Sequence, residues 1–129
     1  MIIKTALMCL ALNIYHEARD QPIQGQISVA EVTLNRVASK HYPNDVCSVV
    51  FQRTKKTCQF SWTCSNKIKP YEKKAWEKSQ NLAEMMLDED GHPSVVGKGV
   101  THYHANYVNP YWSSSLIRVA QVGDHIFYR

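Results

Sequence analysis

Apolar side chains recur every three or four positions near the start of the chain, which is the period of an α-helix. From Ile3 to Ala18 they leave few positions for water, so this segment is predicted to be a central helix buried on most sides. Pro22 and Gly25 mark a break, after which the helical period returns. The apolar face of this second predicted helix consists of Ile27, Ala30, Leu34, Val37 and Ala38. The opposite face carries a polar stripe of Ser28, Glu31, Asn35 and Ser39.

Helical periodicity is lost in the middle of the chain and then returns. Residues 42–45 end the second helix, and residues 46–62 form an irregular stretch that is apolar enough to pack on other segments. A third helix is predicted over residues 70–90, because Pro70 suits a first helical turn and Gly91 a C-terminal cap. Its lysines are expected to face solvent, and its inward positions are Ala75, Leu82 and Met86.

The pattern changes to the two-residue alternation of β-structure beyond Gly99. On a strand over residues 100–105, Val100, His102 and His104 would oppose Thr101, Tyr103 and Ala105. Residues 117–122 and 125–128 flank Gly123-Asp124, a dipeptide typical of a two-residue hairpin. The predicted fold class is therefore α+β and mainly α-helical, with a small β-hairpin near the C-terminus.

Composition predicts one catalytic or binding domain over residues 1–129. The chain is 44% hydrophobic and 20% charged, which suits one hydrophobic core and excludes collagen, coiled coils and acidic disorder. The net charge of +4 favours an anionic partner without identifying it. The apolar start lacks a cleavage signature and falls short of the ~18 apolar residues of a membrane span. We expect synthesis in the cytosol without an export signal, and no membrane insertion.

The four cysteines allow more than one arrangement. Cys9 belongs to the first predicted helix and is expected to be buried and free. Cys58 could pair with Cys64 or with Cys47, and the spacing does not choose between these connectivities. The three later cysteines lack the tight spacing of a structural zinc site, so neither a metal nor another cofactor is expected.

Glu17 is the strongest candidate for chemistry. Helical spacing places it beside Ala6, Leu10 and Ile14, at the C-terminal end of a helix that is buried almost all round. Burial and the negative end of the helix dipole should both raise the pKa of this carboxyl group, which is what a general acid requires at neutral pH. The alternative is a structural glutamate paired with Arg19, Arg36 or His16.

Two histidines offer a competing hypothesis. His102 and His104 share one face of the predicted strand, at a spacing that can bind zinc beside Glu17. A zinc peptidase or amidase needs a third ligand, however, and the chain contains no His-Glu-x-x-His pattern. Aromatic and polar residues surround the strand, so a carbohydrate-binding groove and a packed loop are both consistent with the pattern. The aromatic members are Phe60, Trp62, Tyr103, Tyr107, Tyr111 and Trp112.

Taken together and in order, several segments resemble the SleB-type cell wall hydrolases, the family of spore cortex-lytic enzymes and related phage proteins. The matching segments, spread over most of the chain, are 14–19, 25–37, Tyr42-Pro43, 47–50, Gln59-Phe60-Ser61-Trp62, Thr101-His102-Tyr103-His104, Val108, Pro110, Trp112 and Gly123, His125 and Phe127. Two departures stand out. The family commonly has Glu-Ala-x-Gly-Glu where this chain has Glu17-Ala18-Arg19-Asp20-Gln21, and no separate wall-binding module is recognised.

The resemblance implies a lysozyme-like, transglycosylase-type fold and cleavage of peptidoglycan between N-acetylmuramic acid and N-acetylglucosamine. Glu17 matches the catalytic acid of the family, in which many members need no second carboxyl group. The expected partner is bacterial peptidoglycan. The protein is expected to act as a monomer, as a phage endolysin or related lysis enzyme that a holin releases to the wall. No nucleic acid partner is expected. A non-catalytic wall-binding module is a further alternative.

The resemblance and the aromatic pattern together suggest the walls of a substrate groove. Gln59, Phe60 and Ser61 are expected on one wall, and Tyr103, His104 and Trp112 on the other. Gln26 and Asn35 are expected either to be polar groove residues or to serve the structure of the second helix.

Overall fold

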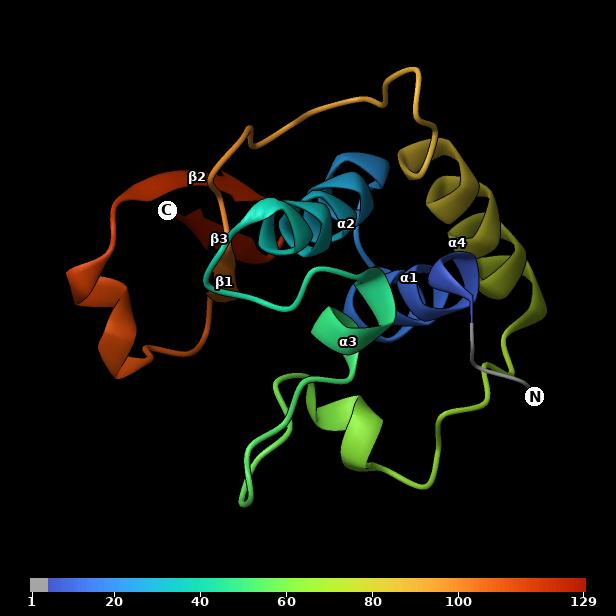
Figure 1. Cartoon of the computed structure of the whole chain (residues 1–129), viewed down its shortest axis with the longest axis horizontal. Coiled ribbons are helices and arrows are strands. Elements are labelled where there is room, and N and C mark those ends of the chain that lie inside the picture. The colour runs from blue at the N-terminus through green and yellow to red at the C-terminus, as the bar shows by residue number, and fades with distance from the viewer. Residues whose placement is uncertain (1–4) are drawn as a thin grey trace.

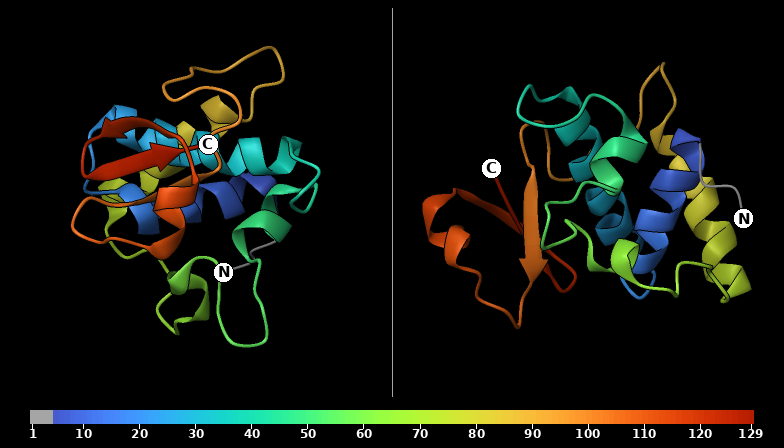
Figure 2. Two further views of the ribbon diagram at one scale, coloured as in Figure 1. Left: turned by 90° about the vertical axis from the view of Figure 1, so that its left-hand side faces the viewer. Right: turned by 60° about the horizontal axis from the view of Figure 1, so that its bottom comes forward.

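The computed structural model describes residues 5–129, in which helices surround a central helix and a small sheet lies at one end (Figure 1). Figure 2 shows the sheet and the last long helix on opposite sides of this arrangement. The elements are α1 (Ala6–Ala18), α2 (Ile23–Ala38), α3 (Val46–Val50), η1 (Ser61–Cys64), α4 (Lys73–Met86), β1 (His102–Ala105), η2 (Tyr111–Ser115), β2 (Arg118–Val122) and β3 (His125–Tyr128). None of the helices in this range is long and apolar enough to cross a membrane.

Helix α1 is the central helix, as its pattern predicts. Thr5 caps its N-terminus by accepting a hydrogen bond from the amide of Met8 at 3.2 Å. The side chains from Cys9 to Tyr15 are all buried, because α1 packs against α2, α3 and α4. The predicted start at Ile3 lies outside the described residues.

Helix α2 begins at Ile23, directly after Pro22, so the predicted break at Gly25 is wrong. Gly25 lies inside the helix, where a Cβ atom would approach the Cβ of Gln21 to 3.1 Å. Glycine therefore avoids a tight contact with Gln21 inside the helix and does not serve a turn. In the polar stripe, Ser28 and Glu31 are buried, since the segment that leads into β1 crosses over it.

Two other helices differ from the prediction. The segment that was expected to be irregular contains α3, whose N-terminus is capped by Asp45 accepting from the amide of Ser48 at 2.8 Å. Helix α4 is shorter than the predicted range of 70–90. Its inward residues Leu82 and Met86 are buried as expected, and Lys73, Lys74 and Lys78 are exposed.

The sheet has the antiparallel order β1-β3-β2. The predicted hairpin is present between β2 and β3, and Gly123 adopts a φ of +58° in its turn. Tyr103 of β1 pairs with Phe127 of β3, and both rings face the helices, where Phe127 is fully buried. The other face of β1 carries His102 and His104.

Two disulfides join the cysteines, and one of them overturns the expectation that Cys9 is free. Cys9 is bonded to Cys47, which α3 brings to a Cα–Cα distance of 5.3 Å. Since α3 was not predicted, no sequence pattern placed Cys47 beside α1. Cys58 is bonded to Cys64, one of the two pairings that the spacing left open.

Candidate active site

Glu17 lies at the C-terminal end of α1, where the helix meets the sheet. The hydroxyl of Tyr103, on β1, donates a hydrogen bond to Oε1 of Glu17. A cavity of about 270 Å³ opens at the carboxyl group, and Arg19, Ala105, Tyr107 and His125 belong to its lining. The structure thus presents the largely covered carboxyl group of Glu17 to a small polar cavity, whose lining also includes Asp20 and Asp124.

The surroundings of Glu17 favour its protonated form. Burial raises the pKa of Glu17, while the bond from Tyr103 and the charge of Arg36 lower it without cancelling the effect of burial. The predicted direction is confirmed, with burial as the main cause. A carboxyl group with a raised pKa can donate a proton near neutral pH and then accept one.

Tyr103 holds the carboxyl group from the sheet side. Burial raises the pKa of Tyr103 well above its usual range, and the neighbouring Glu17 carboxylate adds to the rise. The phenol therefore keeps its proton and acts as a hydrogen-bond donor to Glu17. Its ring is fixed by packing against Phe127, with a centroid distance of 5.5 Å.

Arg36 is a buried cation next to this pair. Only 3% of its surface is exposed, its Nε donates to the carbonyl of Thr101 at 2.8 Å, and its Nη1 has no hydrogen-bond partner. The guanidinium carbon lies 5.1 Å from the ring centre of Tyr42 and 5.5 Å from that of Phe60. Arg36 does not form an ion pair with Glu17, but its charge acts on both Glu17 and Tyr103.

A second cavity, of about 400 Å³, adjoins the first at His16 and Arg19, which line both. His16 stacks on Trp62 with ring centres 4.6 Å apart, and its Nε2 lies 2.8 Å from the carbonyl of Ile68. Burial lowers the pKa of His16, so the ring is neutral at pH 7 and Nε2 is the donor. Together the two cavities form a groove that passes Glu17.

One wall of the groove is anchored to α1 through buried polar side chains. Trp62 donates from Nε1 to Asn13 at 3.0 Å, and Asn13 in turn donates to Thr33 at 3.3 Å. Of the residues expected on this wall, Ser61 lines the larger cavity. Phe60 is 5% exposed and belongs to the hydrophobic core, and Gln59 is exposed outside both cavities.

The residues expected on the other wall divide between the two faces of the sheet. Tyr103 faces Glu17, whereas His104 and Trp112 lie on the opposite face with a ring-centre distance of 5.7 Å. Nε2 of His104 is 2.7 Å from the hydroxyl of Tyr128, and its Nδ1 is 2.7 Å from the carbonyl of Ala105. Both ring nitrogens are therefore engaged, and no group of three potential metal ligands occurs among residues 5–129.

Gln26 and Asn35 both make hydrogen bonds that serve the fold. Gln26 is 2% exposed and donates to the carbonyl of Gln21 at 2.9 Å, which supports the start of α2. Asn35 donates to the carbonyls of Gly97 and Val100, at 2.9 Å each. These contacts match the structural alternative for both residues.

Several groove residues were not found from the sequence. Arg19 pairs with Glu72 rather than with Glu17, and the amide of Glu72 also donates to the Tyr15 hydroxyl at 3.1 Å. His125 lines the smaller cavity with a buried Nδ1 that has no partner. No local pattern links these residues, because Arg19 follows α1, Glu72 lies beside the groove before α4 and His125 begins β3. The Pro70 and hairpin signals predict only the segments of Glu72 and His125.

Comparisons with known proteins show which family and which solved structures this chain resembles. Residues 20–128 match the family described as Cell Wall Hydrolase, a match that begins after Glu17. The spore cortex-lytic enzyme of Oceanobacillus iheyensis is 27% identical over 122 residues, which are 94% of this chain and 40% of that protein. The corresponding enzyme of Bacillus subtilis is 25% identical over 118 residues, or 92% and 35%. The chain thus spans about two-fifths of the curated relatives.

Two solved structures resemble the whole chain. The catalytic domain of the germination-specific lytic transglycosylase SleB from Bacillus anthracis has a TM-score of 0.71 and 26% identity, covering 99% of this chain and 97% of that one. The catalytic domain of the Bacillus cereus SleB protein has a TM-score of 0.64 and 27% identity, covering 96% and 89%. These matches confirm the predicted fold class, α+β and mainly helical.

Proposed function

The chain belongs to the cell wall hydrolase family, and from this premise we propose that it cleaves peptidoglycan glycan strands between N-acetylmuramic acid and N-acetylglucosamine. The proposed activity is that of a lytic transglycosylase, with Glu17 as its one catalytic carboxyl group. The two similar structures, a lytic transglycosylase and a SleB catalytic domain, support this assignment.

The observation that carries the proposal is the placement of Glu17. Its carboxyl group ends a buried helix, faces the groove and has a pKa raised by burial. Tyr103 holds Oε1, which leaves the other carboxyl oxygen to meet a substrate. This is the arrangement expected of a general acid in glycoside cleavage.

The reaction proceeds through two proton transfers at Glu17. The protonated carboxyl group gives its proton to the glycosidic oxygen, and the bond from that oxygen to C1 of the muramoyl residue breaks. The resulting carboxylate removes the proton from the muramoyl 6-hydroxyl group, whose oxygen then bonds to C1 and closes a 1,6-anhydro ring. Atoms balance without water, and Glu17 ends the cycle protonated.

The groove supports a role in binding sugar residues. Ser61, Trp62 and Tyr71 line its larger cavity, and Tyr107 lines the smaller one. Tyr71 is 76% exposed and Tyr107 is 84% exposed, so neither ring contributes to the core. Exposed tyrosines in the two cavities of a polar groove are suited to contact the faces of sugar rings.

Replacing Glu17 by glutamine tests the catalytic assignment. The Glu17→Gln variant keeps the size and hydrogen-bonding capacity of the side chain but has no proton to transfer, so glycan cleavage should fall by about 10²–10⁴-fold. The assay is release of soluble fragments from purified peptidoglycan, with circular dichroism to verify the fold. Glu84→Gln, at an exposed position of α4, is the matched control and should retain full activity.

Mass spectrometry of the released fragments tests the reaction type. Anhydromuramoyl ends support the transglycosylase. Reducing ends would instead indicate hydrolysis, in which water attacks C1; Asp20 and Asp124, which line the same cavity as Glu17, are then the candidates for a second carboxyl group. Free peptides without glycan cleavage, or substantial activity of Glu17→Gln, would contradict the proposal.

The proposal extends to a biological role as a phage endolysin or related lysis enzyme. Under this part of the proposal, a monomer without a cofactor reaches the wall from the cytosol after a holin opens the membrane. The feature that suggests this role is the His102-Tyr103-His104 segment, which resembles phage members of the family. Expression in a bacterial host should cause lysis only when a holin is co-expressed, and lysis without one would contradict this route.

A further inference from the structure

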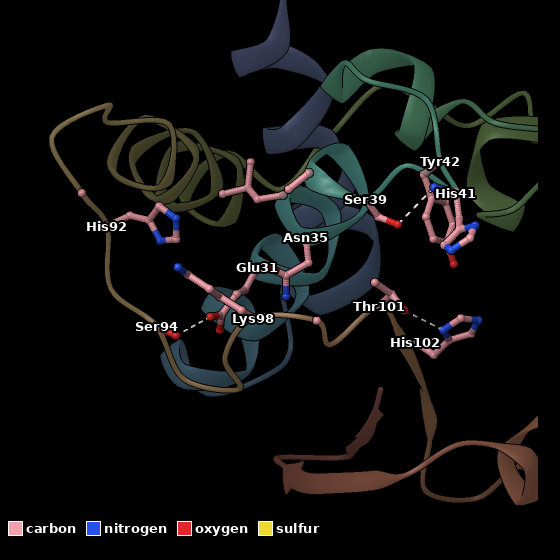
Figure 3. A pocket seen from close by; sticks show the side chains of 14 residues that line it. Glu31, Asn35, Ser39, His41, Tyr42, His92, Ser94, Lys98, Thr101 and His102 are labelled. Carbon is pink, nitrogen blue, oxygen red and sulfur yellow. Dashed lines mark hydrogen bonds between the residues drawn. The ribbon is translucent and has the colours of Figure 1, made fainter.

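A third cavity, of about 990 Å³, lies between α2 and the segment that leads into β1 (Figure 3). It shares no lining residue with the two cavities beside Glu17. Figure 3 shows His92, Ser94 and Lys98 at one end of it and Tyr42 and His102 at the other. Its volume lies at the upper end of the range that holds small organic ligands.

Buried side chains of α2 hold this cavity open in the absence of a ligand. Glu31 is 3% exposed and accepts hydrogen bonds from the amides of Val95 and Val96 at 2.9 Å each and from that of Gly97 at 3.1 Å. The hydroxyl of Ser94 also donates to Glu31. With the two bonds from Asn35, six hydrogen bonds fix the outer wall, so binding does not require ordering of this segment.

The groups that remain available to a ligand are mainly donors or cations. The charge of Glu31 is satisfied by its four donors, whereas Lys98 is exposed and makes no ion pair within residues 5–129. His41, His92 and His102 add imidazole groups around the cavity, and Leu34 and Ala38 provide an apolar floor. This combination suits a ligand with small apolar side chains and carboxylate groups.

One end of the cavity adjoins the catalytic pair. Tyr42 stacks on the guanidinium group of Arg36, and Arg36 donates to the carbonyl of Thr101, another lining residue. His102 is followed directly by Tyr103, whose side chain lies on the other face of β1 and holds Glu17. The cavity thus lies beyond Arg36 from Glu17, and a branch of a substrate bound at Glu17 would pass around Tyr42 and His102 to reach it and extend toward Lys98.

We propose that this cavity binds the stem peptide of the substrate, with Lys98 contacting one of its carboxylate groups. The inference rests on the proposed function, because a peptidoglycan strand is what carries such a branch beside the bond that is cleaved. The inference goes beyond that function, because it predicts that the enzyme cleaves glycan strands that carry stem peptides in preference to strands without them.

The test compares two substrates and two matched charge reversals. Purified peptidoglycan, and the same material after an amidase has removed its peptides, are each digested by the wild type, Lys98→Glu and Lys78→Glu. Lys98→Glu should raise KM for the peptide-bearing strands by about fivefold or more and leave the bare strands within about twofold of the wild type. Lys78 is exposed on α4, so its reversal controls for the change in net charge.

A binding measurement separates this inference from the proposed function. The peptide L-Ala-γ-D-Glu-diaminopimelate is titrated into the Glu17→Gln variant, and NMR shifts are expected at His41, His92 and Lys98 that Lys98→Glu abolishes. Absence of these shifts would overturn the inference, as would equal effects of Lys98→Glu on both substrates, which indicate a sugar subsite instead. If the wild type cleaves neither substrate, the proposed function fails, while the titration still decides whether the cavity binds peptide.

Discussion

Replacing Glu31 by glutamine tests whether one buried carboxylate holds the segment that leads into β1. Oε1 of Glu31 accepts from Val95 and Val96, and Oε2 accepts from Gly97 and from the hydroxyl of Ser94. In the Glu31→Gln variant an NH₂ group takes the place of one oxygen. That group fits best at the Oε2 position, because the Ser94 hydroxyl can turn and accept from it.

The loss of stability follows from this geometry. The amide of Gly97 would face another donor, and an unsatisfied buried donor costs about 1–3 kcal/mol. The remaining bonds would no longer be made to a charged acceptor, which weakens them further. We therefore expect Glu31→Gln to lower the free energy of unfolding by about 2–4 kcal/mol at pH 7. Urea denaturation measures this, with Glu84→Gln as the exposed control.

The pH dependence provides a sharper check. Burial by itself raises the pKa of Glu31, but the bonds from Ser94 and the three amides more than reverse this, so the pKa lies below its ordinary value of 4.5. The stabilisation by the carboxylate is therefore fully present above about pH 4.5 and is lost as the pH falls through the lower pKa of the folded state. The difference between wild type and variant should shrink in acid. Equal stability at pH 7, or a difference that persists in acid, would refute the reasoning.

Two further substitutions test contacts around the groove. Tyr103→Phe removes the hydrogen bond that lowers the pKa of Glu17, so this pKa should rise further and the alkaline limb of the kcat/KM profile should move to higher pH; an unchanged profile would contradict the role of the phenol. Gln21→Glu replaces the amide that donates to Asp124 at 3.1 Å by a carboxylate, which repels the carboxylate of Asp124. The free energy of unfolding should therefore fall by about 1 kcal/mol, and by less in high salt. Thermal unfolding measures this loss, and Asp124→Asn in the same chain should restore the stability.

Gln21 also explains how this chain accommodates its departure from the usual family motif. Its Oε1 accepts from the amide of Asp124 at 2.8 Å, and its Nε2 donates to the carboxylate of the same residue. A glutamate at position 21 could make only the first of these bonds. The amide and Asp124 thus form a matched pair that fastens the hairpin turn to the start of α2.

Local patterns were sufficient to predict the elements whose residues lie close together in the chain. The helical period of α1, the hairpin at Gly123 and the outward lysines of α4 depend on neighbours within a few positions. Glu17 was found in the same way, since its helix is apolar on nearly all sides. The short helix α3 was missed, because five residues are too few to show a period.

The polar stripe of α2 shows what a local sequence pattern does not reveal. The stripe is correctly located, but the pattern contains nothing about residues 94–101, which cover Glu31 and receive two hydrogen bonds from Asn35. The pairing of Cys9 with Cys47 was missed for a similar reason, since 38 positions separate them. In both cases the partner is supplied by a segment that only packing brings near.

Hydrophobic periodicity and turn chemistry thus establish the helices, the hairpin and the buried carboxyl group of Glu17, because each is a property of neighbouring residues. Packing decides what surrounds that carboxyl group. Tyr103 reaches it from β1 and the charge of Arg36 acts on it from α2, and their effects on its pKa depend on distance and burial rather than on position in the chain. The sequence alone identifies Glu17 as a buried carboxyl group at the end of a helix. The pKa of that carboxyl group is decided only when the sheet packs against the helices.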